Sequence, residues 1–184
     1  MFFISALTAA APAVYRSESQ KQVYRSLSKL GISYERVDTD AAVGMETCLA
    51  IDQKLGVPIV KTLFLRNRQQ TQYYLFITRG DKPFCSKAFS AALGISRVSF
   101  APADALERIM GAKIGGTSVL GALLESSRDV QIVFDRDTVG GEWFACSDCT
   151  AYSFLKLRTE DLLQKVLPFA QHRYQVIAVE TGGV

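Results

Sequence analysis

The stretch that decides the fold is Val57-Pro-Ile-Val-Lys61-Thr-Leu-Phe-Leu65, which is apolar except for one lysine and one threonine. Its branched and aromatic side chains predict a buried β-strand. Because side chains alternate between the two faces of a strand, Lys61 would share a face with Ile59, Leu63 and Leu65. An ammonium group there must reach water, bind an anion or lose its proton. Lys61 is therefore either a residue near a strand end, whose aliphatic stem covers apolar surface, or a functional lysine at the base of a cleft.

Working outward from this strand, the polar segment 66–71 leads to a second strand of similar composition at 73–78, which predicts a hairpin with a polar tip. Further strands are expected at 32–37, 97–100, 130–134, 152–157 and 174–179. Helices are expected at 19–30, 45–55, 86–93 and 102–110, and from Thr159 to just before Pro168. Hairpin strands mixed with helices on no strict alternating schedule predict an α/β (α+β) fold, with a mixed, largely antiparallel sheet and flanking helices.

The composition of the chain predicts one globular domain, because 184 residues with 48% hydrophobic and 21% charged side chains can bury one sizeable core. Residues 1–14 are expected to form an N-terminal extension, 15–180 the domain, and 181–184 a frayed tail. The net charge of +3 is too small for a protein that wraps duplex DNA, although a small nucleic-acid contact fits it. We expect no DNA partner.

The first residues do not predict export or membrane insertion. Residues 1–13 resemble the apolar part of a secretory signal, but the positively charged segment that precedes such a part is missing. No apolar run reaches the roughly 18 residues that span a bilayer. Four unevenly spaced cysteines then indicate reduced thiols, so the expected location is cytoplasmic, with no membrane partner.

Common catalytic and cofactor motifs are absent from the sequence. The segment Gly116-Thr-Ser118-Val-Leu-Gly121 misses the G-x-S-x-G spacing by one residue, and neither G-x-G-x-x-G nor the Walker pattern occurs. The only histidine, His172, is expected at the surface. Cys146-Ser-Asp-Cys149 could be a redox pair or half of a zinc site, but the zinc site needs two more ligands. We expect no metal and no cofactor.

Short motifs spread over most of the chain carry a resemblance to a known family. They are Gln20-Lys-Gln-Val-Tyr24, Tyr34-Glu-Arg-Val-Asp38, Val60-Lys-Thr-Leu-Phe-Leu65, Tyr74-Leu-Phe, Gly80-Asp-Lys82, Ser96-Arg-Val-Ser-Phe-Ala101 and Thr159-Glu-Asp-Leu-Leu163. Through them, the run from Tyr15 to about Val179 resembles the YbaK and prolyl-tRNA-synthetase-associated editing domain family, in its free-standing prolyl-tRNA deacylase branch. The resemblance implies trans-editing, the hydrolysis of a mischarged aminoacyl ester on tRNA, typically the alanyl ester on tRNA-Pro.

The resemblance also implies which residues act. Lys61 falls on the functional lysine of the family, and the loop 111–121 falls on the substrate-pocket loop, whose backbone amides face the aminoacyl group. An activated water would attack the ester with help from a ribose hydroxyl of the substrate, while preorganised donors stabilise the oxyanion. Lys61 would act as that cation, as an anchor for the terminal phosphate or ribose, or as a neutral general base. The substrate-binding residues expected from the loop are Gly115, Gly116, Thr117, Ser118 and Gly121.

The chain departs from the family pattern in two places. Many relatives have prolines in the pocket loop where this chain has Ile114 and Val119, which bears on the rigidity of the loop and on the size limit of the pocket. Many relatives also carry a His-Pro and Asn-Thr stretch where this chain has Ala145-Cys-Ser-Asp-Cys-Thr150. Ser147 or Asp148 is expected to substitute there.

The expected partner is the 3′ end of a charged tRNA, tRNA-Pro by resemblance, with a prolyl-tRNA synthetase as a further candidate. A light basic rim of Arg66, Arg68, Arg79 and Lys82 would contact the tRNA, unless these four are simply solvated surface. Two other functions stay open at this point. One is a non-catalytic binding module of the same fold that recognises an aminoacyl or prolyl group, and the other is a thiol protein that uses Cys146 and Cys149.

Overall fold

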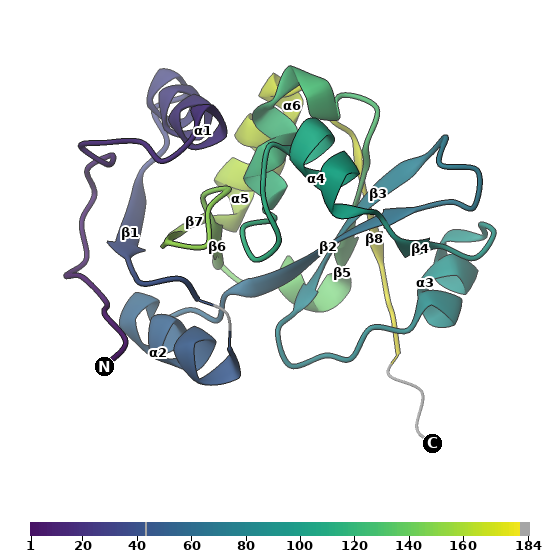
Figure 1. The fold of residues 1–184 in the computed structure, drawn as a ribbon, viewed down its shortest axis with the longest axis horizontal. Coiled ribbons are helices and arrows are strands. Elements are labelled where there is room, and N and C mark those ends of the chain that lie inside the picture. The colour runs from purple at the N-terminus through teal and green to yellow at the C-terminus, as the bar shows by residue number, and fades with distance from the viewer. Residues whose placement is uncertain (43, 181–184) are drawn as a thin grey trace.

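Two β-sheets form the centre of the computed structural model, which describes residues 1–42 and 44–180 (Figure 1). The larger sheet has the strand order β4-β2-β3-β5-β8, and the smaller has the order β1-β7-β6. The strands are β1 (Tyr34–Asp38), β2 (Val60–Arg66), β3 (Tyr73–Arg79), β4 (Ser99–Phe100), β5 (Gln131–Asp135), β6 (Trp143–Ser147), β7 (Ser153–Arg158) and β8 (Tyr174–Ile177). An isolated parallel bridge between Ile59 and Ala145 joins the two sheets.

The pairing confirms the mixed, largely antiparallel fold. The strands β2 and β3 form the expected hairpin, with Lys61 opposite Thr78 and Arg66 opposite Tyr73. The pairs β2–β4, β1–β7 and β6–β7 are also antiparallel, whereas β3–β5 and β5–β8 are parallel. The deciding stretch is thus a strand inside the larger sheet.

Helices cover both sheets (Figure 1). The main ones are α1 (Glu18–Lys29), α2 (Met45–Leu55), α3 (Ser86–Leu93) and α4 (Ala103–Met110). A C-terminal helical stretch consists of α5 (Thr159–Asp161), a π-helical turn η4 (Leu162–Val166) and α6 (Leu167–Phe169). Short 3₁₀ turns lie at η1 (Val119–Leu123), η2 (Glu125–Ser127) and η3 (Arg136–Thr138). Among the helices of the described residues, none is long and apolar enough to cross a membrane.

The core divides into three apolar clusters that follow this arrangement. The largest joins one face of the larger sheet to α1, α4 and the C-terminal helical stretch, and it includes Phe64. The second lies on the opposite face, where Leu63 and Leu65 pack with Phe89 of α3. The third holds α2 against the smaller sheet. Leu63 and Leu65 lie on the face of β2 that is turned to α3, so strand alternation places Lys61 on the same face, as predicted. Lys61 lies at the end of this face that borders a cavity.

Three expectations need correction. The strand β6 was not predicted, and the C-terminal helix does not stop before Pro168 but continues to Phe169. Pro168 lies in α6 and has no N–H to donate to the preceding turn. The wider π-helical turn just before α6 accommodates it. His172 is buried rather than at the surface, with its Nε2 3.5 Å from the Oγ of Ser127.

The first residues of the chain pack onto β1. Ile4 forms a bridge with Thr39 and Thr8 forms one with Arg36, so this segment runs beside the strand as an irregular extra edge. The side chains of Phe2 and Ile4 contact the third apolar cluster. The expected boundary at residue 14 stays a prediction, and the tail 181–184 lies outside the described residues.

Candidate functional site

A cavity of about 940 Å³ opens between α2, the start of β2, the turn after β3, the loop at 115–117 and the smaller sheet. Lys61 lines it together with Gly115 and Thr117, so the predicted lysine and part of the predicted loop share one site. Most of the wall is apolar, and its charged side chains are few. This combination is typical of a ligand site, in which a few polar groups orient a ligand against apolar walls.

Lys61 is half-buried near the beginning of β2, and its ammonium donates a hydrogen bond to the main-chain carbonyl of Lys82. Burial lowers the pKa of Lys61, and the nearby carboxylate of Asp81 partly offsets this effect. No carboxylate within ion-pair distance neutralises Lys61 among the described residues. The ammonium therefore remains available to a negatively charged or strongly polar group of a ligand.

Lys82 does not belong to a free basic rim. Its ammonium lies 2.6 Å from Asp135 and 3.1 Å from Asp137, and its side chain is only 14% exposed. Burial alone would lower the pKa of Lys82, but its hydrogen bonds to the two carboxylates outweigh burial and raise the pKa. Asp135 is itself buried and also accepts a hydrogen bond from Thr78 at 2.9 Å. This ion pair fixes the turn whose carbonyl holds Lys61.

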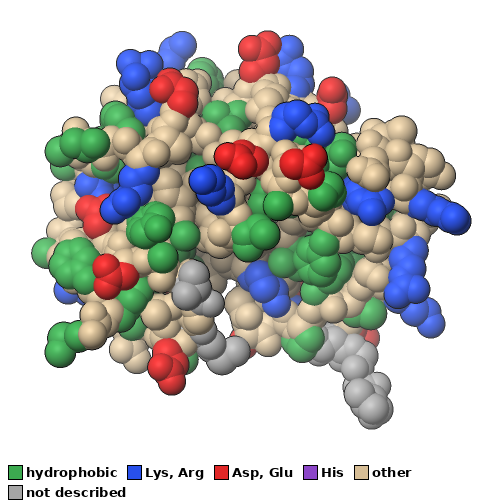
Figure 2. Space-filling model, viewed as in Figure 1, with side chains coloured by type: hydrophobic (Ala, Val, Ile, Leu, Met, Phe, Trp, Pro, Cys, Tyr) green, Lys and Arg blue, Asp and Glu red, His purple; other side chains and the backbone are tan. Residues whose placement is uncertain are grey.

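The other predicted tRNA contacts lie in two separate places. Arg79 lines the cavity but is paired with Asp81 at 2.6 Å. Arg66 and Arg68 lie at the far end of β2 and in the hairpin tip, roughly 17 Å from Lys61 by the rise of a strand. Figure 2 shows basic, acidic and hydrophobic side chains interspersed over most of the face that it views, with several basic side chains along its right edge. The structure does not bring the four residues together.

The loop that precedes η1 is tied to the end of β6. Ser118 donates a hydrogen bond to the carbonyl of Ser147 at 2.6 Å, and the hydroxyl of Ser147 donates back to the carbonyl of Gly116 at 3.2 Å. A Cβ added to Gly116 would lie 2.9 Å from the main-chain carbon of Thr150, so only glycine allows this close approach. Ser147 also lines the cavity, which agrees with its expected place at the pocket.

Three predicted loop residues, Gly116, Ser118 and Gly121, are not among the residues that line the cavity. Gly121 is buried in η1 against Met110. Ser118 is also buried, and its hydroxyl donates its hydrogen bond to the carbonyl of Ser147. Of the two departures from the family loop, Ile114 is exposed and Val119 is part of the main core. Val119 thus anchors the loop by apolar packing, which limits its movement without a proline.

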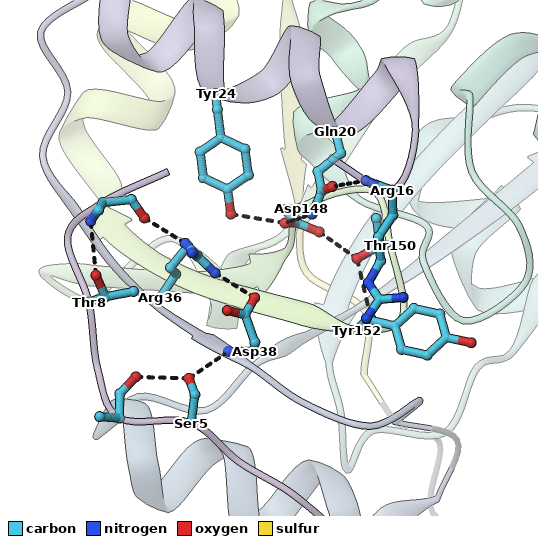
Figure 3. Close-up of polar contacts among 12 residues, drawn as sticks. Ser5, Thr8, Arg16, Gln20, Tyr24, Arg36, Asp38, Asp148, Thr150 and Tyr152 are labelled. Carbon is cyan, nitrogen blue, oxygen red and sulfur yellow. Dashed lines mark hydrogen bonds and ion pairs between the residues drawn. The ribbon is translucent and has the colours of Figure 1, made fainter. Parts of the chain in front are cut away.

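Asp148 is fully buried and is not among the residues that line the cavity. Figure 3 shows its carboxylate between α1 and the turn after β6, where it accepts hydrogen bonds from Gln20 at 2.8 Å, Tyr24 at 2.9 Å and Thr150 at 2.7 Å. Burial raises its pKa against the opposing effect of these hydrogen bonds. Asp148 therefore connects α1 to the segment on which the pocket loop rests.

The cysteine pair does not fit a redox site. Cys146 and Cys149 are buried free thiols, and burial raises the pKa of Cys146 to about 12. Burial likewise raises the pKa of Cys149 well above its usual value. A redox-active thiol needs a lowered pKa, so the thiol hypothesis is unsupported. Within the described part of the chain, no cluster of three or more His, Cys, Asp and Glu side chains is arranged to hold a metal ion.

Sequence reasoning missed two parts of the wall. One is α2, which contributes Cys48, Leu49 and Asp52, and the other is Trp143 of β6. The carboxylate of Asp52 accepts a hydrogen bond from the main-chain N–H of Ile59 at 2.7 Å. Within the helical pattern Asp52 is an ordinary polar position, and only the folded arrangement shows that it faces the site.

Comparisons with known proteins agree with this geometry. The family model described as "Aminoacyl-tRNA editing domain" matches residues 42–165. The "Prolyl-tRNA editing protein ProX" of Acetoanaerobium sticklandii is 29% identical over 145 residues, covering 79% of this chain and 88% of that protein.

Solved structures share the fold. The structure of a candidate trans-editing enzyme for prolyl tRNA synthetase is similar with a TM-score of 0.64 at 16% identity, covering 89% of this chain and 99% of that chain. A scaffold protein for computationally grafted linear epitopes has a TM-score of 0.68 at 18% identity, with 91% and 99% covered. The chain therefore belongs to the aminoacyl-tRNA editing domain family and is an aminoacyl-tRNA hydrolase.

Proposed function

We propose that the protein is a trans-editing deacylase that hydrolyses the ester of a mischarged tRNA, with alanyl-tRNA-Pro as its substrate. The observation that carries this proposal is the shared cavity of Lys61, Gly115 and Thr117. The name of the prolyl-tRNA editing relative supports the choice of tRNA. The expected partner is the charged 3′ end of tRNA-Pro in the cytoplasm, and prolyl-tRNA synthetase is the enzyme whose errors it would correct.

The size of the cavity supports a substrate larger than a free amino acid. A volume of about 940 Å³ lies at the upper end of the usual range for ligand pockets. It accommodates an aminoacyl group together with the terminal nucleoside of the tRNA. Selection of alanine over proline would then depend on the shape of one part of the wall, where exclusion of a larger ring works by steric clash.

The proposed reaction uses water as the nucleophile. No histidine lines the cavity within the described residues, and the cavity-lining thiol of Cys48 has a pKa raised by burial. A water oxygen would bond to the ester carbonyl carbon while a ribose hydroxyl of the substrate relays its proton. The bond between that carbon and the esterified ribose oxygen then breaks, which releases the amino acid and leaves the hydroxyl on the tRNA.

Lys61 and the loop would stabilise the negative charge that develops on the carbonyl oxygen. Preorganised donors of this kind are worth about 10²–10³ in rate when one is removed. The loop is held by hydrogen bonds to Ser147, and the ammonium of Lys61 is held by the carbonyl of Lys82, so neither needs to reorganise during the reaction. The ammonium is thus proposed as the cation of the site.

The test is a panel of charged tRNAs, with the released amino acid measured over time. We expect rapid release of alanine from alanyl-tRNA-Pro and slow release of proline from prolyl-tRNA-Pro. Tight binding of either tRNA without release above the uncatalysed rate would instead identify a non-catalytic binding module. Release from neither, together with no binding, would contradict the proposed function.

A further inference from the structure

Not every carboxylate of the cavity wall is paired with a basic side chain. Three carboxylates line it, from Asp52, Asp81 and Asp137. Asp81 is paired with Arg79 at 2.6 Å, and Asp137 with Lys82 at 3.1 Å. Asp52 has no ion-pair partner within the described residues, and its recorded hydrogen bond is to the N–H of Ile59. Asp52 is therefore the one carboxylate of this wall that no cation of the described chain neutralises.

The position of Asp52 costs the protein free energy. It is half-buried in a wall that Leu49, Val57 and Ile59 also line, and burial raises its pKa. It also lies in the last turn of α2, where the negative end of the helix dipole disfavours an anion. Asparagine would keep an oxygen for the N–H of Ile59 without either cost. A residue that is unfavourable for stability at the wall of a functional cavity indicates a role in binding.

The main-chain contact of Asp52 lies close in sequence to Lys61. The Ile59 N–H that holds the carboxylate of Asp52 precedes Lys61 by two residues, a separation of about 7 Å along an extended chain. One cavity thus offers an unneutralised anion and an unneutralised cation on adjoining walls. A matching ligand carries a positive group and a negative or electron-rich group on neighbouring atoms.

We propose that Asp52 binds the α-ammonium group of the aminoacyl ester, an inference that rests on the proposed function. In such an ester the ammonium and the carbonyl are attached to neighbouring carbon atoms. With the ammonium at Asp52, the carbonyl lies on the side of Lys61 and the loop of Gly115 and Thr117. Asp52 then positions the ester for attack and favours aminoacyl groups over acyl groups that lack the positive charge.

The test compares alanyl-tRNA with lactyl-tRNA, in which a hydroxyl replaces the ammonium. For each ester, kcat/KM is divided by the uncatalysed rate of the same ester. We expect the wild-type protein to prefer the alanyl ester by about 10- to 100-fold, as is usual for a hydrogen bond to a charged group. In Asp52→Asn this preference should fall to about twofold or less, while hydrolysis of the lactyl ester stays close to wild type.

Glu46→Gln is the matched control, because Glu46 is an exposed carboxylate on the same helix and its loss changes the net charge by the same amount. It should retain the wild-type preference. The inference is wrong if the wild type shows no preference, if Asp52→Asn keeps it, or if that variant loses both activities equally, which would indicate a structural role. If the wild type hydrolyses neither ester, the proposed function fails first and this inference falls with it.

Discussion

The ammonium of Lys61 donates a hydrogen bond to the main-chain carbonyl of Lys82. The ammonium of Lys82 itself pairs with the buried carboxylate of Asp135 at 2.6 Å. Lys82, which the sequence suggests as a tRNA contact, is thus part of an ion pair inside the fold. It fixes the turn that holds the lysine of the site.

Lys82→Met should destabilise the protein. The substitution leaves the carboxylate of Asp135 buried without its cation, which typically costs about 3 kcal/mol. Urea unfolding of the variant measures this loss. The double variant Lys82→Met/Asp135→Asn removes the uncompensated charge and should regain part of the stability. A double variant no more stable than Lys82→Met would contradict the role of this ion pair.

Tyr24→Phe should cost about 1.5–3 kcal/mol in the free energy of unfolding, because the buried carboxylate of Asp148 loses one of its donors. Tyr34→Phe is the matched control, since the ring of Tyr34 packs against Tyr24 and its hydroxyl makes no hydrogen bond with any side chain or main-chain group of the described residues. It should change the stability by less than about 0.5 kcal/mol. Both variants keep the aromatic ring, so equal losses would contradict a specific contribution of the hydrogen bond between Tyr24 and Asp148.

Gly116→Ala should reduce kcat/KM for deacylation by about 100-fold, the effect of a misplacement of about 1 Å in a catalytic group. The added Cβ would meet the main chain of Thr150 at 2.9 Å, so the pocket loop must shift. In Gly140→Ala the nearest atom outside the adjacent residues is 4.0 Å away, and this variant should keep wild-type kinetics. Unchanged kinetics in Gly116→Ala would remove the loop from the mechanism.

The stability of a Lys61→Met variant should depend on pH in a defined direction. Burial lowers the pKa of Lys61 in the folded protein below its usual value of 10.5, so the charged form is disfavoured by folding. The resulting loss in the free energy of unfolding is complete at a pH below the pKa of Lys61 in the folded protein. It disappears as the pH rises through the pKa of Lys61 in the unfolded chain. The variant should therefore be more stable than wild type at neutral pH, and the difference due to the charge should vanish above about pH 11. A variant less stable at neutral pH would show that the ammonium stabilises the fold.

The sequence predicts most elements because their local signals agree with the tertiary structure. The bounds expected for α2 are those observed, since Gly56 ends the helix in the left-handed conformation that glycine adopts easily. By contrast, β6 was missed because its strand signal is limited to Trp143 and Phe144, after which small residues lead into the Cys-x-x-Cys turn, and its pairing with β7 determines it. His172 is buried by packing between elements, for which the sequence has no local signal.

The candidate site was predictable only in part. Lys61 is a charged residue in an otherwise apolar strand, and this conflict with the local pattern identifies it as a candidate functional residue. Asp52 carries no such mark, because a polar residue in an amphipathic helix is ordinary. Asp148 was expected at the pocket, yet the fold turns its carboxylate toward α1 and leaves Ser147 at the cavity. Which polar residue of a short segment faces the ligand depends on the pairing of β6, which only the folded chain establishes.

The most direct measurement is the single-turnover rate of alanyl-tRNA-Pro hydrolysis by Lys61→Ala, with Lys54→Ala as an exposed control on α2. We predict that Lys61→Ala is at least about 100-fold slower than wild type, whereas Lys54→Ala is unchanged. Retention of the wild-type rate by a folded Lys61→Ala variant would contradict the central claim that this ammonium stabilises the reacting ester.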